Sequence, residues 1–98
     1  MVTKEEVMKA LSTVKDVETG FDIVEMGLIT GVEIKGDYVK VKMTLTTPLC
    51  PYAGYLFEET EKAVKKLKGV KKVEVEYDWE HPWTPEMASE RIRKMLGI

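Results

Sequence analysis

Hydrophobic residues recur along the chain in two patterns, one with helical spacing and one that alternates. The first helical pattern, over residues 3–14, opens with a threonine and a glutamate at the spacing of a capping box and places Val7, Leu11 and Val14 on one face. A polar stretch containing glycine follows over residues 15–22. We therefore predict an N-terminal helix and then a loop.

An alternating pattern dominates residues 23–45 and predicts β structure. Val32 and Ile34 alternate with charged residues, and Gly36-Asp37 supplies a two-residue turn. Alternation resumes on the returning strand with four apolar residues at every second position: Val39, Val41, Met43 and Leu45. The pattern predicts an antiparallel hairpin with one apolar face.

The second half of the chain predicts a helix, a strand and a last helix. Residues 52–69 keep a helical spacing that ends in lysines and a glycine, and residues 70–78 alternate again. The last helix is expected to start with Thr84 as its N-cap and Pro85 at its first position, and to stop at Gly97. Its apolar face would carry four residues: Ala88, Ile92, Met95 and Leu96.

The predicted order is α-β-β-α-β-α, which is an α+β fold with a small three-stranded mixed sheet. Each strand has one polar side, so we expect the helices to pack mainly on one face of the sheet. A right-handed crossover should join the second and third strands. No repeat or linker interrupts residues 1–98, and we expect a single domain.

Composition narrows the function classes. Apolar residues make up 44% of the 98 residues, charged residues make up 33%, and the net charge is −2. This balance excludes a disordered tail and gives no basic footprint for nucleic acid. We expect no signal peptide and no membrane span, and one cysteine favours a reducing, cytoplasmic setting. The absence of Asn and Gln, with abundant Glu and Lys, suggests a thermophilic source.

That single cysteine, Cys50, lies in the loop "LTTPLCPY" between a strand and a helix. If the helix begins near Pro51 or Tyr52, Cys50 is its N-cap, where the helix dipole would stabilise a thiolate nucleophile or metal ligand. Alternatively, Cys50 is a buried structural thiol, which is the common environment of free cysteine. The residues alone leave both interpretations open.

Other polar residues have ordinary interpretations beside functional ones. Thr46 and Thr47 could hydrogen-bond a thiolate, but threonines at a strand end more often satisfy local backbone groups. Asp16, Glu18 and Asp22 are expected to be solvated or to cap a turn, unless the fold brings their loop beside the cysteine. A carboxylate–thiolate set there would suit iron or zinc.

The segment "YDWEHPWTPE" holds the only histidine, His81, which we interpret as a turn residue rather than a ligand. Trp79 and Trp83 are expected to cover the sheet end and anchor the last helix. The chain has no Cys-x-x-Cys pair, no glycine-rich phosphate loop and no recognisable Ser/His/Asp set.

Four segments together carry a resemblance to a known family: "VKDVETGFDIVEMGLI", "VKMTLTTPLCPY", "LKGVKKVEVEYDWEHPW" and "TPEMASERIRKMLGI". Over nearly the whole chain, the sequence resembles the SufT/PaaD-like family, whose eukaryotic relatives serve in cytosolic iron–sulfur protein assembly. The family's acidic pair matches Asp16 and Glu18, although Val17 stands between them where the family usually has proline. The family's threonine matches Thr46, and its Cys-Pro pair begins at Cys50. The resemblance implies that these four side chains converge on one small pocket.

The resemblance implies a maturation factor for iron–sulfur proteins, which acts as an adaptor or as a transient carrier of iron or of a cluster. One thiolate does not hold a cluster, so we expect no cofactor bound tightly by the monomer. Cys50 would be a transient ligand shared with a partner or a second copy in a homodimer. The expected partners are iron–sulfur assembly proteins and apo-targets. Two alternatives remain: a purely structural adaptor, and a thiol enzyme with Cys50 as its nucleophile.

Overall fold

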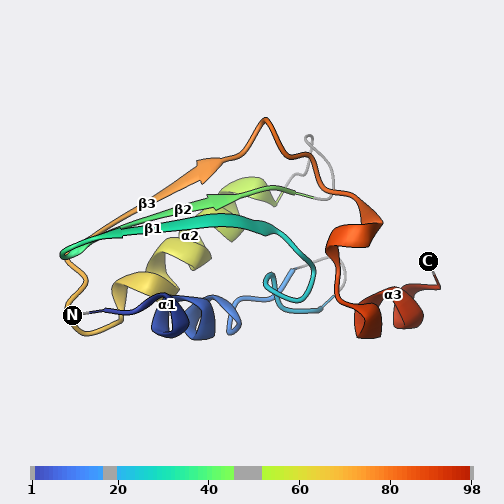
Figure 1. Ribbon diagram of the computed structural model, residues 1–98, viewed down its shortest axis with the longest axis horizontal. Helices are drawn as coiled ribbons and strands as arrows, with labels where there is room; N and C mark the ends of the chain where they lie inside the picture. The colour runs from blue at the N-terminus through green and yellow to red at the C-terminus, as the bar shows by residue number, and fades with distance from the viewer. Residues whose placement is uncertain (1, 17–19, 46–51, 98) are drawn as a thin grey trace.

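A computed structural model describes residues 2–16, 20–45 and 52–97, and its elements follow the predicted order (Figure 1). The α-helices and strands are α1 (Lys4–Leu11), β1 (Ile29–Lys35), β2 (Tyr38–Met43), α2 (Ala53–Lys65), β3 (Lys72–Tyr77) and α3 (Glu90–Leu96), with a 3-10 turn, η1 (Pro85–Met87), before the last helix. The α+β prediction is confirmed.

The three strands form one mixed sheet in the order β1-β2-β3. β1 and β2 are antiparallel and meet at the predicted turn, where Gly36 has a φ of 61° that favours glycine. β2 and β3 are parallel, and α2 connects them. This topology brings the ends of β2 and β3 to the same end of the sheet.

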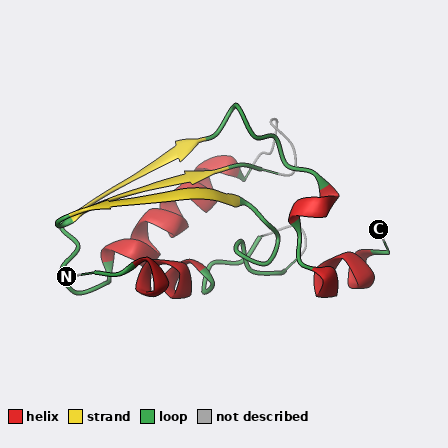
Figure 2. Ribbon diagram, in the orientation of Figure 1, coloured by secondary structure: helices red, strands yellow, loops and turns green. Residues whose placement is uncertain are grey.

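One face of the sheet makes the core. Val41 lies opposite Val32 on one neighbour and Val75 on the other, so the apolar residues of all three strands are in register. Figure 2 shows α1 and α2 on the same side of the sheet, where buried positions such as Leu11 and Leu56 enclose that face. The opposite face carries charged side chains, including a Lys40–Glu76 ion pair at 2.9 Å between Nζ and Oε2.

Two predicted helices are shorter than the pattern suggested. α1 ends at Leu11, although Val14 beyond it is still buried. The last predicted helix is broken, because Ala88 takes an extended conformation with a ψ of 154°. Ser89 is the N-cap of α3, and its Oγ accepts a hydrogen bond from the Ile92 N–H at 3.3 Å. Met95, expected on the buried face, is 63% exposed.

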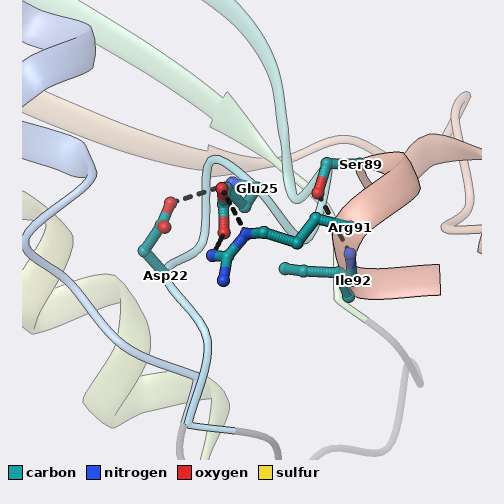
Figure 3. Close-up of polar contacts among 5 residues, drawn as sticks. All are labelled: Asp22, Glu25, Ser89, Arg91 and Ile92. Carbon is teal, nitrogen blue, oxygen red and sulfur yellow. Dashed lines mark hydrogen bonds and ion pairs between the residues drawn. The ribbon is translucent and has the colours of Figure 1, made fainter. Parts of the chain in front are cut away.

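The break has a physical cause in the turn that precedes β1. The Ser89 N–H donates to the Glu25 carbonyl at 2.8 Å, so the backbone leaves helical geometry to dock there. The Arg91 guanidinium also pairs with the Glu25 carboxylate (Figure 3). The Trp83 indole N–H donates to the Met26 carbonyl at 2.6 Å, which confirms its predicted role as an anchor. We call residues 83–96 the C-terminal segment.

Trp79 has only the first part of the role predicted for it, because it covers the end of the sheet at Tyr77. Its side chain is 77% exposed and lies against the Tyr77 ring, with 4.3 Å between the ring centroids. The hydrogen bond that anchors the C-terminal segment belongs to Trp83. No helix in the described part of the chain is both long and apolar enough to cross a membrane.

Candidate functional site

The ends of β2 and β3 define the place where a site could form. The Asp78 N–H donates to the Met43 carbonyl at 2.9 Å, and the Thr44 N–H donates to the Leu28 carbonyl at 2.7 Å. Residues 46–51 follow directly from this end of β2. In sheets with parallel strands, ligands commonly bind beyond the carboxyl ends of the strands. The cysteine-containing segment therefore follows, in the sequence, a strand that ends at a favourable end of the sheet.

Asp16 is the one predicted pocket residue that the structure describes, and its side chain is buried. It is 4% exposed, which is rare for an aspartate and contradicts the expectation of a solvated loop carboxylate. Its N–H donates to the Phe21 carbonyl at 2.8 Å, and its carbonyl accepts from the Gly20 N–H at 2.8 Å. Hydrogen bonds across the base of the loop therefore hold Asp16 in place.

The other three predicted pocket residues, Glu18, Thr46 and Cys50, lie outside the described residues, as does Thr47. The convergence of the four side chains therefore stays a prediction. One part of the argument for Cys50 is wrong, however. α2 begins at Ala53 with Tyr52 as its N-cap, so Cys50 is two residues before the cap and does not have the predicted capping position.

Asp22, the third acidic residue of the loop, has the ordinary role expected of it. Its Oδ1 accepts the Glu25 N–H at 2.8 Å and so caps the turn that precedes β1 (Figure 3). Across residues 2–16, 20–45 and 52–97, no three or more His, Cys, Asp or Glu side chains are grouped so that they could hold a metal ion.

Thr44 is a polar residue at this end of the sheet that the sequence did not single out. Its side chain is fully buried, yet its hydroxyl has no hydrogen-bond partner within the described part of the chain. Thr60 is equally buried, but its hydroxyl donates to the Leu56 carbonyl at 2.7 Å. Buried polar groups without partners are few in native proteins, so Thr44 offers an unused hydroxyl two residues before Thr46.

A second group that the sequence did not single out is a hydrogen-bonded carboxylate, Asp78, just after β3. Asp78 accepts from the Thr30 hydroxyl at 2.7 Å, from the Glu80 N–H at 3.0 Å and from the His81 Nδ1 at 2.8 Å. These bonds, with that from Thr30 foremost, lower the pKa of Asp78 to about 2. The carboxylate is therefore ionised at neutral pH, and it holds the His81 ring at the Nδ1 atom.

This carboxylate–histidine pair agrees with the interpretation of His81 as a turn residue, because it closes the bend over residues 78–81. The local part was visible in "DWEH", because an aspartate that accepts the N–H two residues ahead is a common turn. The contact with Thr30 joins residues 48 positions apart and has no local signal. The His81 side chain is 66% exposed and lies beside the end of β3.

Comparison with known proteins places this architecture among maturation factors. Residues 4–77 match the family model described as iron–sulfur cluster assembly protein. The chain is 41% identical to the Fe-S protein maturation auxiliary factor YitW of Bacillus subtilis, over 97% of this chain and 94% of that protein. It is 38% identical to an Fe-S protein maturation auxiliary factor of Porphyromonas gingivalis, over 98% and 92% of the two lengths.

A solved structure agrees with the fold. A conserved hypothetical protein of Thermotoga maritima has a TM-score of 0.88 and 47% identity, and the match covers 99% of this chain and 96% of that one. The C-terminal segment lies outside the family model, yet the full-length matches include it.

Proposed function

The chain belongs to the iron–sulfur cluster assembly protein family, and we propose that it acts as an auxiliary factor in the maturation of iron–sulfur proteins. The observation that carries the proposal is similarity over nearly the full length to two proteins named for that role. The fold is consistent with it, because a buried carboxylate, Asp16, occupies the loop that matched the family motif.

We propose further that Cys50 provides a transient thiolate ligand for iron or for a cluster in transit. Within this proposal Thr46 orients the thiol, and Asp16 and Glu18 set the local charge or share a metal. A single thiolate leaves most cluster positions unfilled, so the remaining ligands would come from a partner or a second copy of the chain. The cluster is thus cargo that passes through a shared site, and a cytoplasmic setting stays a prediction.

Anaerobic reconstitution tests this mechanism. The protein is incubated with ferrous iron, sulfide and an apo-iron–sulfur enzyme, and recovery of the enzyme's activity and visible spectrum is followed. We expect Cys50→Ala to abolish the stimulation and Asp16→Asn to reduce it. Asp37→Asn, an exposed aspartate in the hairpin turn, is the matched control and should behave like the wild type. Thermal melts of all three variants separate lost function from lost fold.

The outcome for Cys50→Ala also distinguishes the alternatives. Full stimulation by this variant would refute the carrier mechanism and leave a factor that only presents apo-targets to a donor. A thiol enzyme requires a reactive thiolate, and the N-cap position that would have supported one belongs to Tyr52. Alkylation of Cys50 with a rate that rises only near pH 8.5, as for an ordinary thiol, would exclude that enzyme.

A further inference from the structure

A groove lies between the end of α1 and the outer face of α2. The two helices pack side by side on one face of the sheet (Figures 1 and 2). The groove has a volume of about 580 Å³, which is within the range of about 300–1,000 Å³ typical of binding sites. This groove has no role in the proposed function so far.

Small side chains create the groove. Ala10 of α1 and Ala63 of α2 both line it, and their methyl groups leave open the space that larger residues would fill. Val14 adds apolar surface to the groove. Tyr55, in the first turn of α2, also lines the groove and is 52% exposed. The lining thus includes an apolar strip and an aromatic ring that can pack against an apolar side chain.

The charge of the groove is positive although the chain as a whole is negative. Three lysines, Lys15, Lys62 and Lys66, line it against one carboxylate, Glu59. Lys62 already pairs with acidic neighbours on α2, with Nζ–O distances of 3.3 and 3.9 Å. Lys15 and Lys66 are exposed and form no ion pair with any residue that the structure describes.

Helix stability explains why a lysine occupies position 66 but not why one occupies position 15. Lys66 is the C-cap of α2, where a cation interacts favourably with the helix dipole. Lys15 lies beyond the end of α1, and its backbone pairs with Asp22 at the base of the acidic loop. Its side chain therefore extends a positive surface along the groove and has no ion-pair partner among the described residues.

The dimensions of the groove indicate what it could hold. Lining residues extend along α2 from Tyr55 to Lys66, about 16 Å at 1.5 Å per residue. That length matches about five residues of extended chain at about 3.3 Å each. A small anion would occupy only one end and would leave the tyrosine and the alanines uncovered. An acidic peptide with an apolar residue matches both the charge and the length.

We propose that this groove binds an acidic segment of a partner polypeptide, with carboxylates on Lys15 and Lys66 and an apolar side chain against Tyr55. The inference deepens the proposed function and rests on it, because an assembly factor needs a surface that recognises its partners. Lys15 immediately precedes Asp16, and Tyr55 lies five residues after Cys50. A segment in the groove would thus contact residues that flank Asp16 and the start of α2.

The test uses the full chain and a fluorescein-labelled peptide of glutamates with a central phenylalanine, with binding followed by fluorescence anisotropy at low salt. Lys15→Glu with Lys66→Glu should weaken binding about tenfold or more. The control, Lys4→Glu with Lys35→Glu, changes the net charge equally at exposed lysines outside the groove and should change affinity less than about twofold. Equal weakening by the two double variants would overturn the proposal.

A second pair of variants tests the apolar contact. Tyr55→Ala should weaken peptide binding several-fold, whereas Tyr52→Ala, an exposed tyrosine of the same helix end that does not line the groove, should not. Inorganic pyrophosphate is the competing small anion. Displacement of the peptide by pyrophosphate at equal concentration would overturn the peptide assignment in favour of a small-anion site.

The Cys50→Ala variant separates this inference from the proposed function. It should bind the peptide like the wild type, because the proposed peptide contacts are made by Lys15, Lys66 and Tyr55. Loss of peptide binding by the lysine variants together with normal maturation would refute the groove as the partner surface, and would leave the assembly function intact. Normal peptide binding by Cys50→Ala with unchanged maturation would refute the carrier mechanism alone.

Discussion

Replacing Gly27 by alanine should release the C-terminal segment from the turn before β1. Gly27 has a φ of 76°, and a Cβ at this position would lie 2.1 Å from the Met87 carbonyl oxygen, where ordinary contact begins at 3.4 Å. The neighbour is backbone, so it cannot move aside as a flexible side chain would. The overlap is relieved only if η1 and the chain after it shift away from the turn.

Gly20 provides a matched control for this substitution. It has a φ of 77°, but nothing lies within 4 Å of a Cβ built there. An alanine in the left-handed conformation costs about 1–2 kcal/mol at either site. The extra cost at Gly27 is limited by the contacts that hold the segment. These are two hydrogen bonds of about 1 kcal/mol each and the burial of Ile92, about 1.5–3 kcal/mol. We expect Gly27→Ala to destabilise by about 2–4 kcal/mol more than Gly20→Ala.

Urea denaturation gives the free energy of unfolding of both variants, and hydrogen exchange locates the damage. In Gly27→Ala the Ser89 amide should lose its protection, because it no longer reaches the Glu25 carbonyl. The emission of Trp83 should shift to the red as its indole leaves the Met26 carbonyl. Equal destabilisation by the two variants, with the Ser89 amide still protected, would refute the docking described above.

Three further predictions concern single polar side chains. Thr44→Val should raise the free energy of unfolding by about 1 kcal/mol, because it removes a buried hydroxyl without a described partner. Thr60→Val is the control and should not stabilise the protein, because it removes a hydroxyl that donates a hydrogen bond. A destabilised Thr44→Val would contradict this prediction. Because the folded pKa of Asp78 lies below its ordinary 3.8, the stability it contributes is present above about pH 4 and is lost as pH falls towards 2. Urea midpoints measured against pH should therefore fall less steeply over that interval in Asp78→Asn, and parallel curves would refute the assignment. Arg91→Ala should lower the melting temperature at low salt and have little effect at 1 M salt, since the pair with Glu25 is exposed.

The elements were predictable because their signals are local. The capping box of α1, the glycine turn between β1 and β2, and the alternation of the strands each involve residues within a few positions. The break at Ala88 was not predictable, because its cause is a hydrogen bond from Ser89 to Glu25, a residue 64 positions earlier. The helical spacing correctly predicted α3, but the hydrogen bond to the distant Glu25 carbonyl determines where that helix begins.

The candidate site shows the same limit of prediction from local sequence, because two aspartates of one loop have different environments. Asp16 and Asp22 were both expected to be solvated or to cap a turn; Asp22 does cap a turn, whereas Asp16 is buried. The backbone pairing of Lys15 with Asp22 gives the loop base a strand-like alternation, in which Val14 and Asp16 are buried while Lys15 is exposed. One local geometry therefore directs a carboxylate inwards beside the family motif and a lysine outwards into the groove. If both proposals hold, this pairing connects partner recognition to the pocket, and a substitution that breaks it should impair peptide binding and maturation together.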